Sequence, residues 1–147
     1  MKTVAKWGFY IIVFILFKMV DDYVPRDIDS ELLPYVESFE KWTGTKLQGR
    51  YYSVKFARQY PGVAGVAIGM NNDDAVIVRI DPIIWARLSE QQRSWLVYHE
   101  LAHDVHNSRH GSSFLMSRSI PVHLTDRIME AVKEQYNKTL KYGTNKI

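Results

Sequence analysis

The first 26 residues have a pattern of their own, in which an uninterrupted apolar run over 7–17 is preceded by Lys2 and Lys6 and followed by Lys18. A basic start before an apolar run is typical of a secretory signal or a signal-anchor. The run is shorter than the roughly 20 residues that span a bilayer, but apolar neighbours extend it. No small-x-small pair follows it as a cleavage site would require. We therefore predict an uncleaved transmembrane signal-anchor and linker over residues 1–26.

Two alternatives to the anchor stay open, a cleaved signal and a buried helix of the domain core. With an anchor, the lysines before the run stay in the cytoplasm, and the domain, residues 27–147, lies on the extracytoplasmic side of the membrane. With a cleaved signal, the domain is secreted or periplasmic.

The domain opens with apolar residues at helical spacing, which predict an amphipathic helix. These residues are Leu33, Val36, Phe39 and Trp42. Ser30 is a suitable N-cap for this helix, and Gly44 suits the position just after its end.

After this helix, apolar and polar residues alternate along the chain. Tyr52, Val54 and Phe56 alternate with polar residues, which predicts a half-buried strand. Two further extended segments, Val63–Met70 and Ala75–Ile80, are separated by a run of Asn and Asp, whose side chains favour turns. This pair predicts a hairpin.

A long central helix is predicted over 90–106, because Ser89 and Gln92 form a capping-box pattern and nothing breaks a helix before Asn107. Before it, Asp81-Pro82 ends a strand and a short helical segment follows. Thr125 is predicted to cap a last helix, which ends near residue 143. The residues predicted to share its buried face are Ile128, Val132 and Tyr136.

The order of helix, strands, helix, loop and helix predicts an α+β fold, in which helices cover one side of a small mixed sheet and the N-terminal apolar helix precedes the domain. A chain of 147 residues suits one such domain. With 46% hydrophobic and 24% charged residues, it is neither a disordered tail nor a polytopic membrane protein.

The absence of cysteine limits the chemistry of the chain. There is no disulfide framework and no thiolate site, so any metal ligands are His, Asp or Glu. The net charge of +3 is mild and does not by itself indicate a nucleic-acid partner. We interpret the lysines of the last helix as a solvated face.

Candidate chemistry lies in the central helix, as His99-Glu100-Leu101-Ala102-His103. Two His at i and i+4 share a helical face, so both imidazoles can reach one Zn²⁺, and Glu100 can take a proton from zinc-bound water. Asp104 either orients an imidazole or lies exposed on the helix, while Trp95 either lines substrate space or packs in the core.

A catalytic zinc site needs a third protein ligand and one open position. His106 lies two turns from His99 on the same helix, about 10 Å along the axis, and is therefore excluded. If the helix ends near Asn107, the chain can turn back and present His110, which we predict as the third ligand. A carboxylate on the last helix, Glu130, is the alternative, and His123 is a further candidate.

The stretch from Ile80 to Met116 resembles small zinc metallopeptidases of phages and bacteria, which are similar to the matrixin-like metzincins. The resemblance lies in an Ile-Asp pair, a Trp and short helix, the His-Glu-x-x-His helix, a later His and a Met. It implies His99, His103 and His110 as zinc ligands, Glu100 as general base, and Met116 as the residue of the turn beneath the metal. His110 comes one residue later than the third His of that family.

The sequence thus predicts a zinc-dependent metallopeptidase that acts on protein or peptide substrates, with its N-terminal segment in a membrane. We expect the substrate to lie along the edge of the sheet, on the strand Ala75–Ile80. One alternative is a DNA-associated protease, because His110, Gly111 and Phe114 also resemble the SprT and WLM-type proteases. The other is an envelope protein that binds zinc and a partner without catalysis.

Overall fold

The computed structural model describes residues 26–45, 51–71 and 74–143. The predicted signal-anchor and linker, apart from Arg26, lie outside the described residues. Within the described ranges, no helix is both long and apolar enough to cross a membrane. Membrane attachment through the N-terminal segment therefore stays a prediction.

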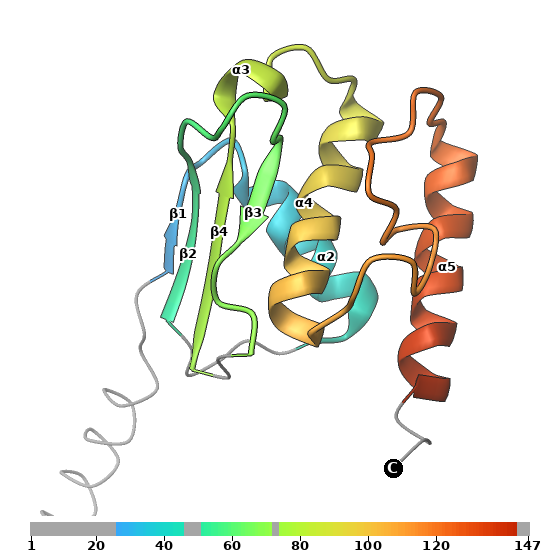
Figure 1. Ribbon diagram of the computed structural model, residues 1–147. Coiled ribbons are helices and arrows are strands. Elements are labelled where there is room, and N and C mark those ends of the chain that lie inside the picture. Colours follow the sequence, from blue (N-terminus) through green and yellow to red (C-terminus); the bar gives the residue numbers. More distant parts are fainter. Residues whose placement is uncertain (1–25, 46–50, 72–73, 144–147) are drawn as a thin grey trace, which may run out of the picture.

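A four-stranded mixed sheet forms one layer of the domain, with the strand order β1-β2-β4-β3 (Figure 1). β1 (Arg26–Ile28), β2 (Tyr51–Phe56) and β4 (Ala75–Ile80) run parallel, and β3 (Gly65–Ala67) pairs antiparallel with β4. The α+β class and the mixed sheet are confirmed, and so is the hairpin. β1 escaped prediction because three residues are too few to show an alternation.

β3 is shorter than the predicted extended segment and lies at the edge of the sheet. We expected the substrate on the strand Ala75–Ile80, and that choice of strand is wrong. β4 is bonded to β2 on one side and to β3 on the other, so it has no free edge. In the described sheet the edge strands are β1 and β3, and β3 is the one that contacts α4.

The first helix, α2 (Leu33–Thr43), ends as predicted, because Gly44 adopts the left-handed conformation with φ 69°. Ser30 is not its N-cap. The chain makes a turn over residues 30–32, in which the Asp29 carbonyl accepts the N–H groups of Leu32 and Leu33, and the helix begins only after Leu32. Ser30 therefore lies before the helix, outside capping reach of its first turn.

Two helices that follow β4 are capped by side chains, and the sequence analysis predicted the cap of the second one only. The Asp81 carboxylate accepts the N–H groups of Ile83 and Ile84 at the start of α3 (Pro82–Trp85). Ser89 and Gln92 form the capping box of α4 (Glu90–His106), and Asn107 ends that helix with φ 50°. Both bounds of the central helix are confirmed.

The last helix, α5 (Asp126–Gly143), begins after Thr125 as predicted, but its buried face is shifted. Ile128 is 37% exposed, whereas Met129 is 4% exposed. Met129 is spaced from Val132 and Tyr136 by three and seven residues, which also follows the helical repeat. The helix packs through this stripe, so the predicted inclusion of Ile128 is wrong.

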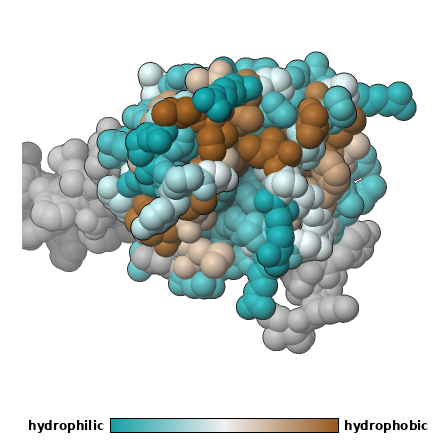
Figure 2. Space-filling model, turned by 45° about the horizontal axis from the view of Figure 1, so that its top comes forward, coloured by the Kyte–Doolittle hydropathy of each residue, from teal (hydrophilic) through white to brown (hydrophobic). Residues whose placement is uncertain are grey.

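Helices α2 and α4 lie against one face of the sheet, and α5 packs on the outer side of α4 (Figure 1). Alternate strand residues enter the core between the sheet and the helices. They are Tyr52 and Val54 of β2 with Val76, Val78 and Ile80 of β4. Some large apolar side chains stay exposed, and Figure 2 shows apolar groups among hydrophilic ones on the top of the domain.

The carboxylate of Asp104 joins α4 to the β3–β4 hairpin. Asp104 Oδ2 accepts the N–H of Gly69 at 2.8 Å and the N–H of Ile77 at 3.1 Å. A Cβ on Gly69 would lie 2.6 Å from this oxygen, so a glycine is needed there. Asp104 is 3% exposed, and the expectation of an exposed helical Asp is wrong.

We predict that Asp104→Ala lowers the free energy of unfolding by about 2–6 kcal/mol, because two backbone donors lose their acceptor at about 1–3 kcal/mol each. Urea denaturation of the variant beside the unchanged chain measures this. The control is Glu37→Ala, at an exposed position of α2, for which a change within about 0.5 kcal/mol is expected. Equal effects of the two substitutions would contradict the role of Asp104.

Candidate metal centre

The central helix α4 presents His99, Glu100 and His103 to a cleft beside the edge strand. His99 and His103 lie one turn apart, so their rings project from one face of the helix. His99 and Glu100 are buried, whereas His103 is partly exposed. The buried ring of Trp95, one turn before His99, stacks on the His99 imidazole with the ring centroids 4.7 Å apart.

His110 reaches the same place through the turn that ends α4. Asn107 has a φ of 50° and Gly111 a φ of 82°, so the chain reverses direction around residues 107–111. The Gly111 N–H then donates to the Met116 carbonyl at 2.9 Å. This turn brings His110 back to the histidines of α4.

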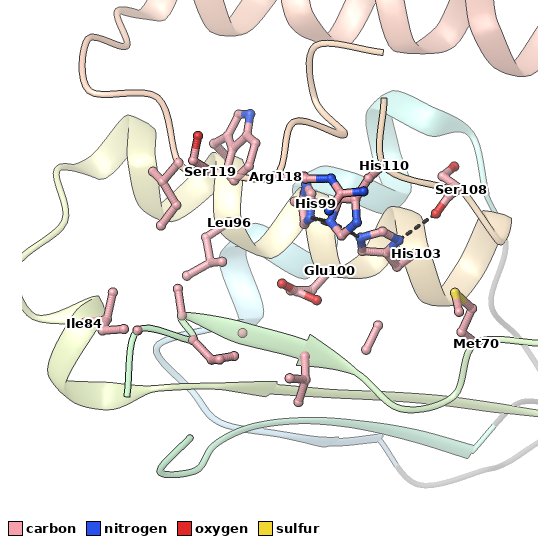
Figure 3. Close-up of a pocket in the computed structure, with 18 of the residues that line it drawn as sticks. Met70, Ile84, Leu96, His99, Glu100, His103, Ser108, His110, Arg118 and Ser119 are labelled. Atoms are coloured by element: carbon pink, nitrogen blue, oxygen red, sulfur yellow. Dashed lines mark hydrogen bonds between the residues drawn. The ribbon is translucent and has the colours of Figure 1, made fainter. Parts of the chain in front are cut away.

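The Nε2 atoms of the three histidines form a nearly equilateral triangle (Figure 3). His99 Nε2 lies 3.1 Å from His103 Nε2 and 3.2 Å from His110 Nε2, and the third side is 3.1 Å. Three nitrogens bound to a tetrahedral zinc ion at 2.0–2.1 Å lie about 3.3 Å apart. These three histidines could therefore hold one metal ion.

Backbone carbonyls determine which ring nitrogen carries the proton. His99 Nδ1 donates to the Leu115 carbonyl at 2.7 Å, and His103 Nδ1 donates to the Ser108 carbonyl at 2.6 Å. In the neutral rings, both Nε2 atoms therefore carry lone pairs, which point toward each other and cannot form a hydrogen bond between themselves. A cation between them converts this repulsion into attraction, which is the fit that a metal site requires.

Burial keeps the two helical histidines neutral. It lowers the pKa of His99 to about 4, with further lowering from His103 and His110, and it lowers the pKa of His103. Neutral imidazole is the form that binds a metal ion. Near pH 7 no proton has to leave either ring for a metal ion to bind.

The Glu100 carboxylate lies between α4 and the edge strand. A Cβ on Gly65 of β3 would lie 2.9 Å from Glu100 Cγ and 3.0 Å from Oε1, so the side chain runs directly against the strand backbone. Burial raises the pKa of Glu100 to about 7. A carboxylate with such a pKa can exchange a proton near neutral pH.

The turn with Leu115 and Met116 lies close to the histidines. The Leu115 carbonyl holds His99, and the Met116 carbonyl accepts the N–H of Gly111 beside His110. Both side chains are fully buried. The role of Met116 beneath a metal ion stays a prediction.

The other proposed ligands lie elsewhere. Glu130 is exposed on α5 and pairs with Lys133 at 2.8 Å. His123 is exposed and is not among the residues that line the cleft. His106 bonds through Nδ1 to Tyr136 at 3.0 Å and through Nε2 to Thr45 at 2.9 Å, so it joins helices rather than the metal centre.

The sequence reasoning missed the groups that orient the ligands. Ser108 and Leu115 act through their backbone carbonyls, which every residue has, so no residue type could reveal them. Ser108 is itself fixed by its Oγ, which lies 2.7 Å from the Tyr136 hydroxyl on α5. The helical period predicted that Tyr136 is buried, but not that its hydroxyl holds this loop.

A cleft of about 740 Å³ surrounds the centre. β3 and the residues before it form one wall, α4 forms the floor, and residues 108–110 and 118–120 form the opposite wall. Figure 3 shows Ile84 and Leu96 toward one end, Met70 and Ser108 toward the other, and the histidines between them. The cleft is therefore elongated and follows the edge strand.

No family model, curated protein or solved structure matches this chain. The fold and the site by themselves define its class, an α+β protein with a three-histidine cluster that could hold a metal ion.

We predict that Tyr136→Phe weakens zinc binding about tenfold, because the hydroxyl fixes Ser108, whose carbonyl orients His103. Competition with a chromophoric chelator measures the affinity. The matched control is Tyr98→Phe, which removes another buried hydroxyl, bonded to Ser38 at 2.8 Å and remote from the Ser108 loop. Equal zinc affinity in the two variants would exclude an orienting role for Tyr136.

Proposed function

We propose that this protein is a zinc-dependent metallopeptidase. The observation that carries the proposal is the convergence of three His Nε2 atoms at 3.1–3.2 Å in a cleft that also contains a buried carboxylate, Glu100. The cleft follows a free sheet edge. Together these features provide a metal, a base and a binding surface for an extended chain.

Zinc is the metal that the ligand set favours. Three neutral imidazoles without a thiolate match the ligands of catalytic zinc sites, which keep one position open. Among the described residues, the potential ligand group holds these three histidines and no carboxylate. All three histidines line the cleft, so an open position on the ion would be reached from the cleft.

Bound zinc would lower the pKa of a water molecule toward about 7 and polarise the carbonyl of the scissile bond. Glu100, next to His99 on the helix, takes the proton from the attacking water. It then passes this proton to the nitrogen of the leaving amine. Its raised pKa suits both steps, since the group must accept and release one proton in a cycle.

The substrate backbone has a place along β3. The Ile68 N–H donates to the Ile77 carbonyl of β4, and the Ala64 carbonyl accepts the N–H of Asp81, the residue just after β4. Since alternate residues of a strand direct their backbone groups to opposite sides, those of Gly65 and Ala67 point away from β4. An extended peptide can therefore pair with Gly65 and Ala67 and pass in front of Glu100.

We further propose that the domain is a minimal metallopeptidase similar to the matrixin-like metzincins. Residues 1–26 would attach this domain to a membrane. The DNA-associated alternative has less support, because two lysines of α5 pair with glutamates of the same helix. Lys133 pairs with Glu130 at 2.8 Å, and Lys138 pairs with Glu134 at 2.7 Å. The non-catalytic alternative requires a fourth protein ligand, and the described histidine cluster includes none.

We predict that Glu100→Gln lowers hydrolysis of a quenched fluorescent casein by at least about a hundredfold, because a positioned general base contributes about 10²–10⁴ in rate. Zinc content should stay near one ion per chain, since Glu100 is not a ligand. Glu130→Gln is the control, because its carboxylate is exposed on α5, and it should keep full activity.

Two results would overturn the proposal. Full activity in Glu100→Gln would show that Glu100 is not the general base. A zinc-loaded, unmodified chain that cleaves nothing and does not bind acetohydroxamate would have a closed, structural site in place of a catalytic one.

A further inference from the structure

Two arginine side chains line the cleft without a described partner. Arg109 stands beside His110, and Arg118 stands two residues after Met116. Over residues 26–45, 51–71 and 74–143, neither side chain forms an ion pair or a hydrogen bond. Both residues are exposed, so water solvates their positive charges in the empty cleft. A substrate that covers the cleft removes this water and must supply a negative partner in its place.

The charges around the cleft do not balance. Glu100 is the one carboxylate among the lining residues, and it lies buried against Gly65 rather than near the rim. The other ionisable lining groups are the two arginines and the three histidines. A metal ion on the histidines adds further positive charge, so the cleft attracts negative charge.

Arg118 has a defined place in the cleft. Figure 3 shows Arg118 and Ser119 on the wall opposite β3, between the histidines and the end that carries Ile84 and Leu96. A peptide paired with β3 directs alternate side chains away from the strand face, toward this wall or the floor. One of its side chains would therefore meet Arg118 next to the apolar end.

We propose that the cleft selects peptides that carry an aspartate or glutamate beside an apolar residue. The acidic carboxylate pairs with Arg118 and the apolar side chain packs on Ile84 and Leu96. Arg109, which also lines the cleft, attracts further negative charge. This inference rests on the proposed peptidase function, and it names the class of substrate.

A peptide fits this charge better than a nucleic acid does. The cleft presents a free strand edge for a peptide backbone at Gly65 and Ala67, and much of its lining is apolar. Only two arginines are available in it, and Lys133 and Lys138 on α5 are paired with glutamates. A nucleic-acid surface needs a continuous row of free cations.

The test measures peptide binding separately from cleavage. Two pools of fluorescein-labelled nonapeptides contain leucine next to one fixed position, which is glutamate in the first pool and glutamine in the second. Their affinity for zinc-loaded and for zinc-free Glu100→Gln protein is measured by fluorescence anisotropy, at low salt and at 0.5 M salt. We expect about three- to tenfold tighter binding of the glutamate pool, and a smaller difference at high salt.

Variants of the Glu100→Gln protein locate the effect. Arg118→Gln should abolish the preference for glutamate without weakening binding of the glutamine pool, and Arg118→Lys should retain most of it. Arg127→Gln, at an exposed position of α5 outside the cleft lining, is the matched control and should leave the preference intact.

The outcomes separate this inference from the proposed function. Equal binding of the two pools overturns the inference, whether or not the unmodified chain cleaves peptides. So does a single-stranded oligonucleotide that displaces the peptides and binds more tightly than they do. A preference that depends on Arg118, in a chain that hydrolyses no peptide, supports the inference and overturns the peptidase.

Discussion

Two hydrogen bonds from ring nitrogens to backbone carbonyls hold the candidate metal centre together. His99 donates to Leu115 at 2.7 Å and His103 donates to Ser108 at 2.6 Å, so the loop after α4 is fixed to the helix at two points. The same loop carries His110 and Arg118. The direction of the lone pairs, the position of the third ligand and the far wall of the cleft therefore depend on one set of contacts.

The central helix α4 buries three polar side chains at and near the site. His99, Glu100 and Asp104 are each at most 7% exposed, and burying such groups is unfavourable unless they are bonded or neutral. The Leu115 carbonyl compensates His99, and the hairpin N–H groups compensate Asp104. Glu100 responds to burial through a pKa raised to about 7. The group least compensated by structure is thus the one to which we assign proton transfer.

The helices whose ends are marked by capping residues could be predicted from the sequence. The order in which the strands pair in the sheet could not. The capping box at Ser89 and the left-handed Asn107 bounded α4 correctly, because such caps depend on adjacent residues. The edge position of β3 depends on strand order, which is set by contacts between distant residues. In the site, the spacing of His99 and His103 was sufficient for that pair. The backbone carbonyls that orient the rings could not be predicted, because every residue type has one.

Zinc titration of the metal-free chain by calorimetry, beside His110→Ala and His123→Ala, tests the central claim most directly. The account predicts one zinc ion per chain for the unmodified protein and for His123→Ala. For His110→Ala it predicts binding weaker by more than about a hundredfold, since even a group that only orients a ligand contributes about 10–100-fold. Unchanged affinity in His110→Ala, or no zinc binding by the unmodified chain, would contradict the three-histidine centre.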